Sequence, residues 1–147
     1  MGLADALERL AAVAVEGVAS YAPDETPEAL GGAQLPALVI VPELGGNWPG
    51  LEPSLFAVGH GWLEARIAHL LLVAPVAGGS GARGAFPALA AAIDAYARAL
   101  AADPDLGGTL ARPPVVRVSA GVVPYGGIDY HAVTFVHHWV LRLAPGV

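Results

Sequence analysis

The chain has 147 residues, which is enough for one domain with its own core, and we expect a single domain over residues 1–147. Thirteen acidic residues stand against seven basic ones, all arginine, and the net charge of −6 argues against duplex DNA binding through phosphate contacts. The lack of cysteine excludes disulfides and thiolate metal sites, and a charged content of 14% favours a subunit that covers part of its surface with partners.

Apolar residues recur at helical spacing near the start of the chain and predict a helix over residues 3–20, which Pro23 ends. The same segment carries Asp5 and no basic cluster, so it is not typical of a secretory signal. The most apolar run, residues 70–77, is far shorter than the roughly 20 residues of a membrane span. We therefore expect a protein without a membrane partner.

The middle of the chain alternates between apolar runs and stretches rich in glycine and proline. Residues 35–42 form a short branched run bounded by prolines and predict a buried strand. Residues 45–53 contain three glycines and two prolines and predict a loop. Residues 62–74 predict a strand, although the spacing of their leucines and isoleucine also fits a helix.

The clearest helix is predicted over residues 86–102. Its apolar face is continuous, and Pro87 falls in the first turn, where a missing N–H does no harm. Asp103-Pro104 ends it, because the residue before a proline avoids the α region. We expect the whole apolar face, Phe86 and Tyr96 included, to belong to the core.

The chain closes with a strand over residues 115–124, the tight link Tyr125-Gly126-Gly127, and an alternating run over residues 128–143. Sixteen extended residues span roughly 50 Å, against about five or six residues in a typical strand. Both faces of this run are largely apolar, so a partner subunit or the N-terminal helix is expected to cover the second face. Together these elements predict an α+β fold, a mostly antiparallel sheet with a long C-terminal hairpin packed against two main helices.

A glycine motif precedes the clearest helix. Residues from Gly79 to Gly84 match G-x-G-x-x-G, the pattern of a dinucleotide-binding loop. The chain has only one strand–helix unit of this kind, and the strand after the helix has no acid at its end to bind a ribose. We favour a surface loop and no cofactor; a small nucleotide-binding enzyme that uses this loop remains the less favoured alternative.

Five histidines raise the question of a metal site. His137 and His138 are adjacent and must point to opposite faces of a strand, while His131 lies roughly 20 Å from His137 along it. No HExxH motif, carboxylate cluster or G-x-S-x-G serine accompanies them. We expect no catalytic residues and no bound metal, and therefore a protein that is not an enzyme.

The order of the C-terminal elements resembles that of the tail terminator, or tail completion, proteins of tailed bacteriophages. The resemblance rests on the helix over residues 88–102, the link Asp-Pro-Asp-Leu-Gly-Gly-Thr-Leu at residues 103–110, and the Tyr125-Gly126-Gly127 hairpin, with a helix opening at the start of the chain.

This resemblance implies a homo-oligomeric ring, a homohexamer, that caps the tail tube and joins it to the head connector. The expected partners are the tail tube protein and a head connector or head completion protein, with DNA passing through the pore without specific binding. The expected location is the virion, in its tail or neck, after assembly in the host cytoplasm. Another phage neck or tail-tube structural protein, or a dimeric binding domain, remains an alternative.

Five residues are expected at a partner interface. Trp48 and Leu51 lie among glycines and prolines, and tryptophan is enriched in interface hot spots. Arg83 lies in the glycine motif with no acid nearby in sequence, and Tyr125 and Trp139 belong to the C-terminal hairpin. The alternative is that Trp48 packs onto its own core and that Arg83 is solvated.

Overall fold

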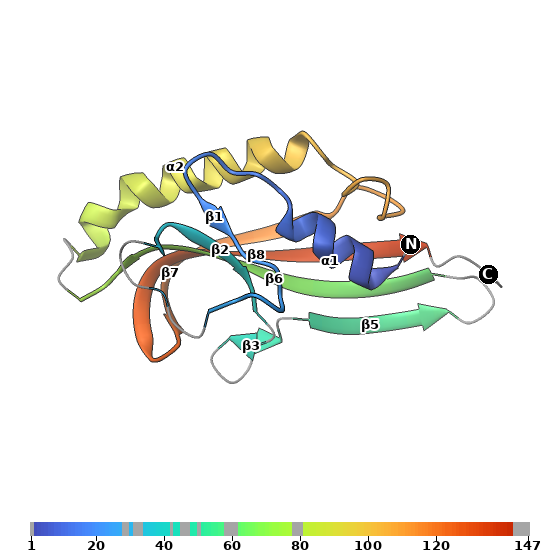
Figure 1. The fold of residues 1–147 in the computed structure, drawn as a ribbon, viewed down its shortest axis with the longest axis horizontal. Coiled ribbons are helices and arrows are strands. Elements are labelled where there is room, and N and C mark those ends of the chain that lie inside the picture. The colour runs from blue at the N-terminus through green and yellow to red at the C-terminus, as the bar shows by residue number, and fades with distance from the viewer. Residues whose placement is uncertain are drawn as a thin grey trace.

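The computed structural model describes residues 2–27, 30, 34–41, 43–44, 48–49, 51–57, 62–77 and 81–142, with the backbone alone for residues 43–44, 48–49, 51–57 and 82. The elements follow one another as α1 (Leu3–Ala11), β1 (Ala19–Ser20), β2 (Ala37–Ile40), β3 (Glu43–Leu44), β4 (Trp48–Pro49), β5 (Leu51–Ala57), β6 (Trp62–Pro75), α2 (Gly81–Ala101), β7 (Val115–Tyr125) and β8 (Ile128–Arg142). The fold is α+β, as the sequence predicts (Figure 1).

One six-stranded sheet organises the chain, in the order β1-β2-β6-β8-β7. β5 also pairs with β6, along residues 62–67, while β2 pairs with residues 69–72 of the same strand. All pairs in this sheet are antiparallel except β1 with β2. The long strands β6 and β8 are therefore central, and β7 is an edge strand.

Both helices pack on the same face of the sheet. Leu10 of α1 lies in a cluster with Trp139 and Leu141, and Tyr96 of α2 lies in a cluster with Phe135. Ile67 of the first cluster and Leu71 of the second lie an even number of residues apart on β6. Both clusters therefore lie on the same face of the sheet. Figure 1 shows α2 lying lengthwise over the strands.

The opposite face is partly covered by the chain between β1 and β2. Leu30 is buried there against Leu70 and Tyr130, and the Tyr130 hydroxyl donates to the Leu30 carbonyl oxygen at 2.7 Å. The Tyr125 hydroxyl donates to the carbonyl oxygen of Pro27 in the same region. This finding corrects the expectation that the N-terminal helix covers this face, while a partner subunit on the rest of it stays a prediction.

The N-terminal helix is shorter than predicted, because α1 ends at Ala11 and not near residue 20. Val13 and Val15 are both buried, two residues apart, which is the spacing of an extended chain. Gly17 follows with a φ of 75°, and β1 then pairs with β2. The apolar stripe over residues 3–20 therefore divides between a helix and an extended segment.

The predicted loop over residues 45–53 is also wrong in part. Trp48–Pro49 pairs with Glu43–Leu44, and β5 begins at Leu51, where it pairs with Ile67 of β6. Gly45, Gly46, Asn47 and Gly50 lie outside the described residues. The strands over residues 35–42 and 62–74 are confirmed as β2 and β6.

The helix predicted over residues 86–102 begins earlier, at Gly81, and ends at Ala101 as Asp103-Pro104 predicts. Pro87 consequently lies inside α2 and not in its first turn. Tyr96 is buried as expected, but Phe86 is 70% exposed, which contradicts its assignment to the core.

The C-terminal hairpin is confirmed. β7 and β8 pair through eleven consecutive residue pairs, from Val115 with His138 to Tyr125 with Ile128, without a shift of register. The two residues of the turn, Gly126 and Gly127, have φ values of 60° and 80°. Positive φ at both positions is the requirement of a type I′ turn, which glycine meets without strain.

Candidate interaction surface on the C-terminal hairpin

The backbone N–H and C=O groups of β7 point alternately to β8 and to the open edge of the sheet. Two hydrogen bonds of β8 show which residues point which way. The Asp129 carbonyl accepts from Val76, which follows β6, and the Val140 carbonyl accepts from Ala111, which precedes β7. Even-numbered residues of β8 therefore face β7. By the register, odd-numbered residues of β7 bond to β8, and residues 116, 118, 120, 122 and 124 turn their backbone groups to the open edge.

Exposed apolar side chains gather on this hairpin. In the part of the chain whose side chains are described, five large apolar residues are exposed, and four lie on it: Val115 (67%), Val118 (43%), Val122 (54%) and Ile128 (37%). The fifth, Phe86, lies on α2. Valines this exposed on an edge strand are a surface that the subunit does not cover itself.

The edge of β7 has little of the protection that edge strands usually carry. Charges, prolines and bulges normally keep such edges from pairing. β7 has no bulge, its one charged residue is Arg117, and its one proline is Pro124, near the end. Pro124 occupies a position whose N–H would point to the open edge, so the pairing with β8 loses nothing. Residues 116, 118, 120 and 122 thus offer complete N–H and C=O pairs.

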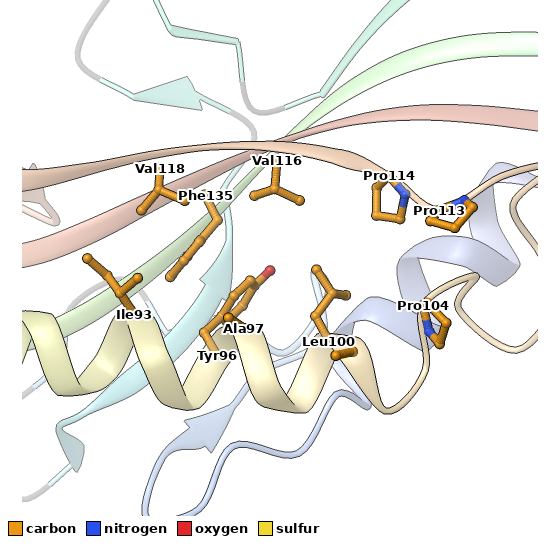
Figure 2. Close-up of a pocket in the computed structure, with 11 residues that line it drawn as sticks. Ile93, Tyr96, Ala97, Leu100, Pro104, Pro113, Pro114, Val116, Val118 and Phe135 are labelled. Carbon is orange, nitrogen blue, oxygen red and sulfur yellow. The ribbon is translucent and has the colours of Figure 1, made fainter.

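An apolar cleft of about 370 Å³ lies beside this edge, between α2 and β7 (Figure 2). Figure 2 shows Ile93, Ala97 and Leu100 of α2 on one side. Val116 and Val118 face them from β7, with Pro113 and Pro114 just before the strand. The lining is apolar apart from the Tyr96 hydroxyl, and it consists of Ile93, Tyr96, Ala97, Leu100, Ala101, Pro104, Pro113, Pro114, Val116, Val118 and Phe135.

Behind the cleft, four buried side chains form one hydrogen-bonded row. Trp139 Nε1–H donates to His137 Nδ1 across 3.2 Å. Because an indole nitrogen only donates, the His137 proton must lie on Nε2, 2.5 Å from the Tyr96 oxygen. Tyr96 then donates to His69 Nδ1 across 2.8 Å. The His69 proton lies on Nε2, a buried atom without a hydrogen-bond partner.

Burial keeps this row neutral. It lowers the pKa of His137 to about 3, and burial together with the nearby His137 lowers the pKa of His69 well below its ordinary value. Burial also raises the pKa of Tyr96. Each of the four side chains is at most 1% exposed, so the row has no access to a substrate. Its hydrogen bonds instead hold α2 on the sheet.

The expected interface residues have different positions. Arg83 is exposed in the first turn of α2. Tyr125 is half-buried and bonded to Pro27, so its hydroxyl already has a partner. Trp139 is fully buried in the core of the subunit, which corrects its assignment to a partner interface: β8 is central, and the helices cover this face. The backbones of Trp48 and Leu51 lie in β4 and β5, but their side chains are outside the described residues.

The glycine motif and the histidines are also placed. Gly81 and Gly84 lie in the first turn of α2, which differs from the expected surface loop, while Gly79 and Ser80 lie outside the described residues. His137 is buried and His138 exposed, on opposite faces of β8 as predicted; His60 is not described. Among the described residues there is no group of three or more potential metal ligands, and no helix suited to span a membrane.

Sequence reasoning missed both the open edge of β7 and the buried row. The valine-rich sequence of β7 is equally typical of a central strand, so exposure depends on the order of the strands. His69, Tyr96 and His137 are far apart in sequence, and only the pairing of β6 with β8 brings the two histidines together. One signal was present: a lone histidine within the apolar run of β6 needs a buried partner.

Comparison with known proteins identifies no family, curated protein or solved structure that matches the chain.

Proposed function

We propose that the chain is a structural virion subunit that resembles a phage tail terminator. In this proposal, copies assemble into a ring of six that caps the tail tube and joins it to the head connector. The work of such a subunit is geometric: one surface is complementary to the end of the tube, and the surface needed to add another tube ring is missing. DNA passes through the ring without specific contacts.

The observation that carries this proposal is the uncovered edge of the C-terminal hairpin. Val118 and Val122 are 43% and 54% exposed on a strand whose outward backbone groups are unpaired among the described residues. A monomer gains nothing from leaving such a surface open, because it invites association. The acidic charge of −6 agrees with a pore that does not retain DNA, since phosphates are repelled by like charge.

The proposal is tested with the tail-tube protein encoded by the same genome. Tube lengths are measured by negative-stain microscopy as the chain is added during tube growth, and the mass of capped ends by mass photometry. We expect tubes to stop growing and to carry a ring of six copies. Tubes of unchanged length, with no chain bound at their ends at any ratio, would refute the proposal.

A further inference from the structure

The sequence of the open edge strand is nearly symmetric about Ser119. Reading outward from that residue, Val115 corresponds to Val123 and Val116 to Val122. Val118 corresponds to Ala120, and Arg117 to Gly121. When an antiparallel copy is placed about a two-fold axis at Ser119, this symmetry sets valine opposite valine at the ends of the paired segment.

We propose that two copies of the free protein pair through β7, antiparallel, about a two-fold axis at Ser119. In this register Val116 faces Val122 of the second copy, and Val118 faces its Ala120. These four residues are the ones whose N–H and C=O groups point to the open edge, so every facing pair exchanges two hydrogen bonds. The two sheets join into one, with the α2 helices of both copies on the same face.

The side chains support this register on both faces. On the helix face, the exposed Val122 of the second copy lies against Val116, at the wall of the apolar cleft, and covers it. On the other face, Arg117 meets Gly121, and no atom lies within 4 Å of the place where a Gly121 Cβ would be. The guanidinium therefore has room and does not oppose its own copy.

The neighbouring register, with its axis at Ala120, is worse. It places Val116 opposite Pro124, which has no N–H to donate, so the Val116 carbonyl at each end of the pairing is left without a donor. The axis at Ser119 leaves Pro124 just outside the paired segment. This difference favours the axis at Ser119 over the axis at Ala120.

The pairing uses the same edge of β7 that supports the ring proposed above, so a copy has to leave the pair before that edge can serve in a ring. A two-fold contact is closed and cannot alone build a ring of six, so it belongs to the free protein, where it covers the edge that would otherwise recruit further strands. The two failures are distinguishable, because the pair is measured in the free protein without tube, whereas capping is measured with tube present.

A single cysteine tests the register in the purified protein, because the chain contains none. In the proposed pair, Ser119 faces Ser119 of the second copy at a non-hydrogen-bonded position, where Cα atoms are about 4.5 Å apart, within the range of a disulfide. Ser119→Cys should therefore form a covalent dimer on mild oxidation. The matched control is Gly121→Cys, also exposed, where the two copies of the residue lie about 13 Å apart.

Sedimentation of the protein without substitutions, and of two further variants, completes the test. Ala120→Pro removes an outward N–H, as Pro124 already does, and should raise the Kd of the pair about tenfold or more while the β7–β8 ladder remains. Ala120→Val keeps the N–H and should leave the dimer intact. A protein that is monomeric at about 0.1 mM, or Ser119→Cys that cross-links no faster than Gly121→Cys, would overturn the proposal.

Discussion

The Tyr96 hydroxyl lies 2.5 Å from His137 Nε2, and this bond attaches α2 to the central strand β8. Tyr96 also stacks on Phe135, with ring centroids 3.6 Å apart and planes within 14°. One side chain therefore supplies both an apolar and a polar contact between the helix and the sheet. The predictions for stability begin with this residue.

Tyr96→Phe should destabilise the fold by about 3 kcal/mol. The ring stack on Phe135 survives, but His137 Nε2–H and His69 Nδ1 both lose their partner in a buried site, and each unsatisfied group costs about 1–3 kcal/mol. Urea denaturation gives the change in the free energy of unfolding. Tyr125→Phe is the control, because the half-buried Tyr125 makes one bond and should cost about 1 kcal/mol. Equal losses of unfolding free energy in the two variants would contradict the hydrogen-bonded row through Tyr96.

The free energy of unfolding should fall as the pH drops below about 6.5, the ordinary pKa of histidine. The folded protein keeps His137 neutral down to a pKa of about 3, and His69 likewise resists protonation, whereas both residues bind protons in the unfolded chain. Their contribution is complete above pH 6.5 and is lost progressively toward pH 3, by a few kcal/mol. Denaturation curves at several pH values measure this dependence. A flat profile in this range would show that the histidines are not buried as neutral groups.

Gly127→Ala should cost about 1–2 kcal/mol, since Gly127 has a φ of 80° and a side chain is strained in that region. Gly121→Ala provides the comparison on the same hairpin: its φ is not positive and no atom lies within 4 Å of the added Cβ, so it should be close to neutral. Thermal melts of both variants separate backbone strain from the loss of flexibility. A similar loss for both would indicate that the turn is not of type I′.

Replacing Trp48 and Arg83 together with alanine tests the remaining expected interface residues. If they contact a partner, the variant keeps its melting temperature but no longer forms rings or caps tubes. Arg83 is exposed in the first turn of α2, so Arg83→Ala alone should change stability by less than about 0.5 kcal/mol. A double variant that melts several degrees earlier, and still caps tubes, would instead place Trp48 in the core.

Much of the fold could be predicted from the sequence because its signals are local. An alternating run marks β8, Asp103-Pro104 marks the end of α2, and Gly126-Gly127 marks the turn. The predictions that were wrong concern segments whose secondary structure depends on strand pairing. The helical stripe over residues 3–20 continues past Ala11, yet the chain there becomes extended and β1 pairs with β2. Pro53 discourages a strand that the pairing with β6 nevertheless forms.

The candidate surface was less predictable for the same reason. An aromatic residue such as Trp139 satisfies the composition of an interface, yet the central position of β8 buries it. The valines of β7 have the composition of a core, yet the edge position exposes them. Composition reports what a side chain prefers, whereas strand order determines whether the preference is met.

The contact of α1 with β8 has a consequence for the time course of folding. Leu10 packs in one cluster with Trp139 and Leu141, residues that the ribosome adds long after α1. A helix of nine residues is marginal alone in water, so α1 emerges early and has to wait for its docking site. We expect a slow folder whose N-terminal segment stays accessible to protease until β8 has been synthesised.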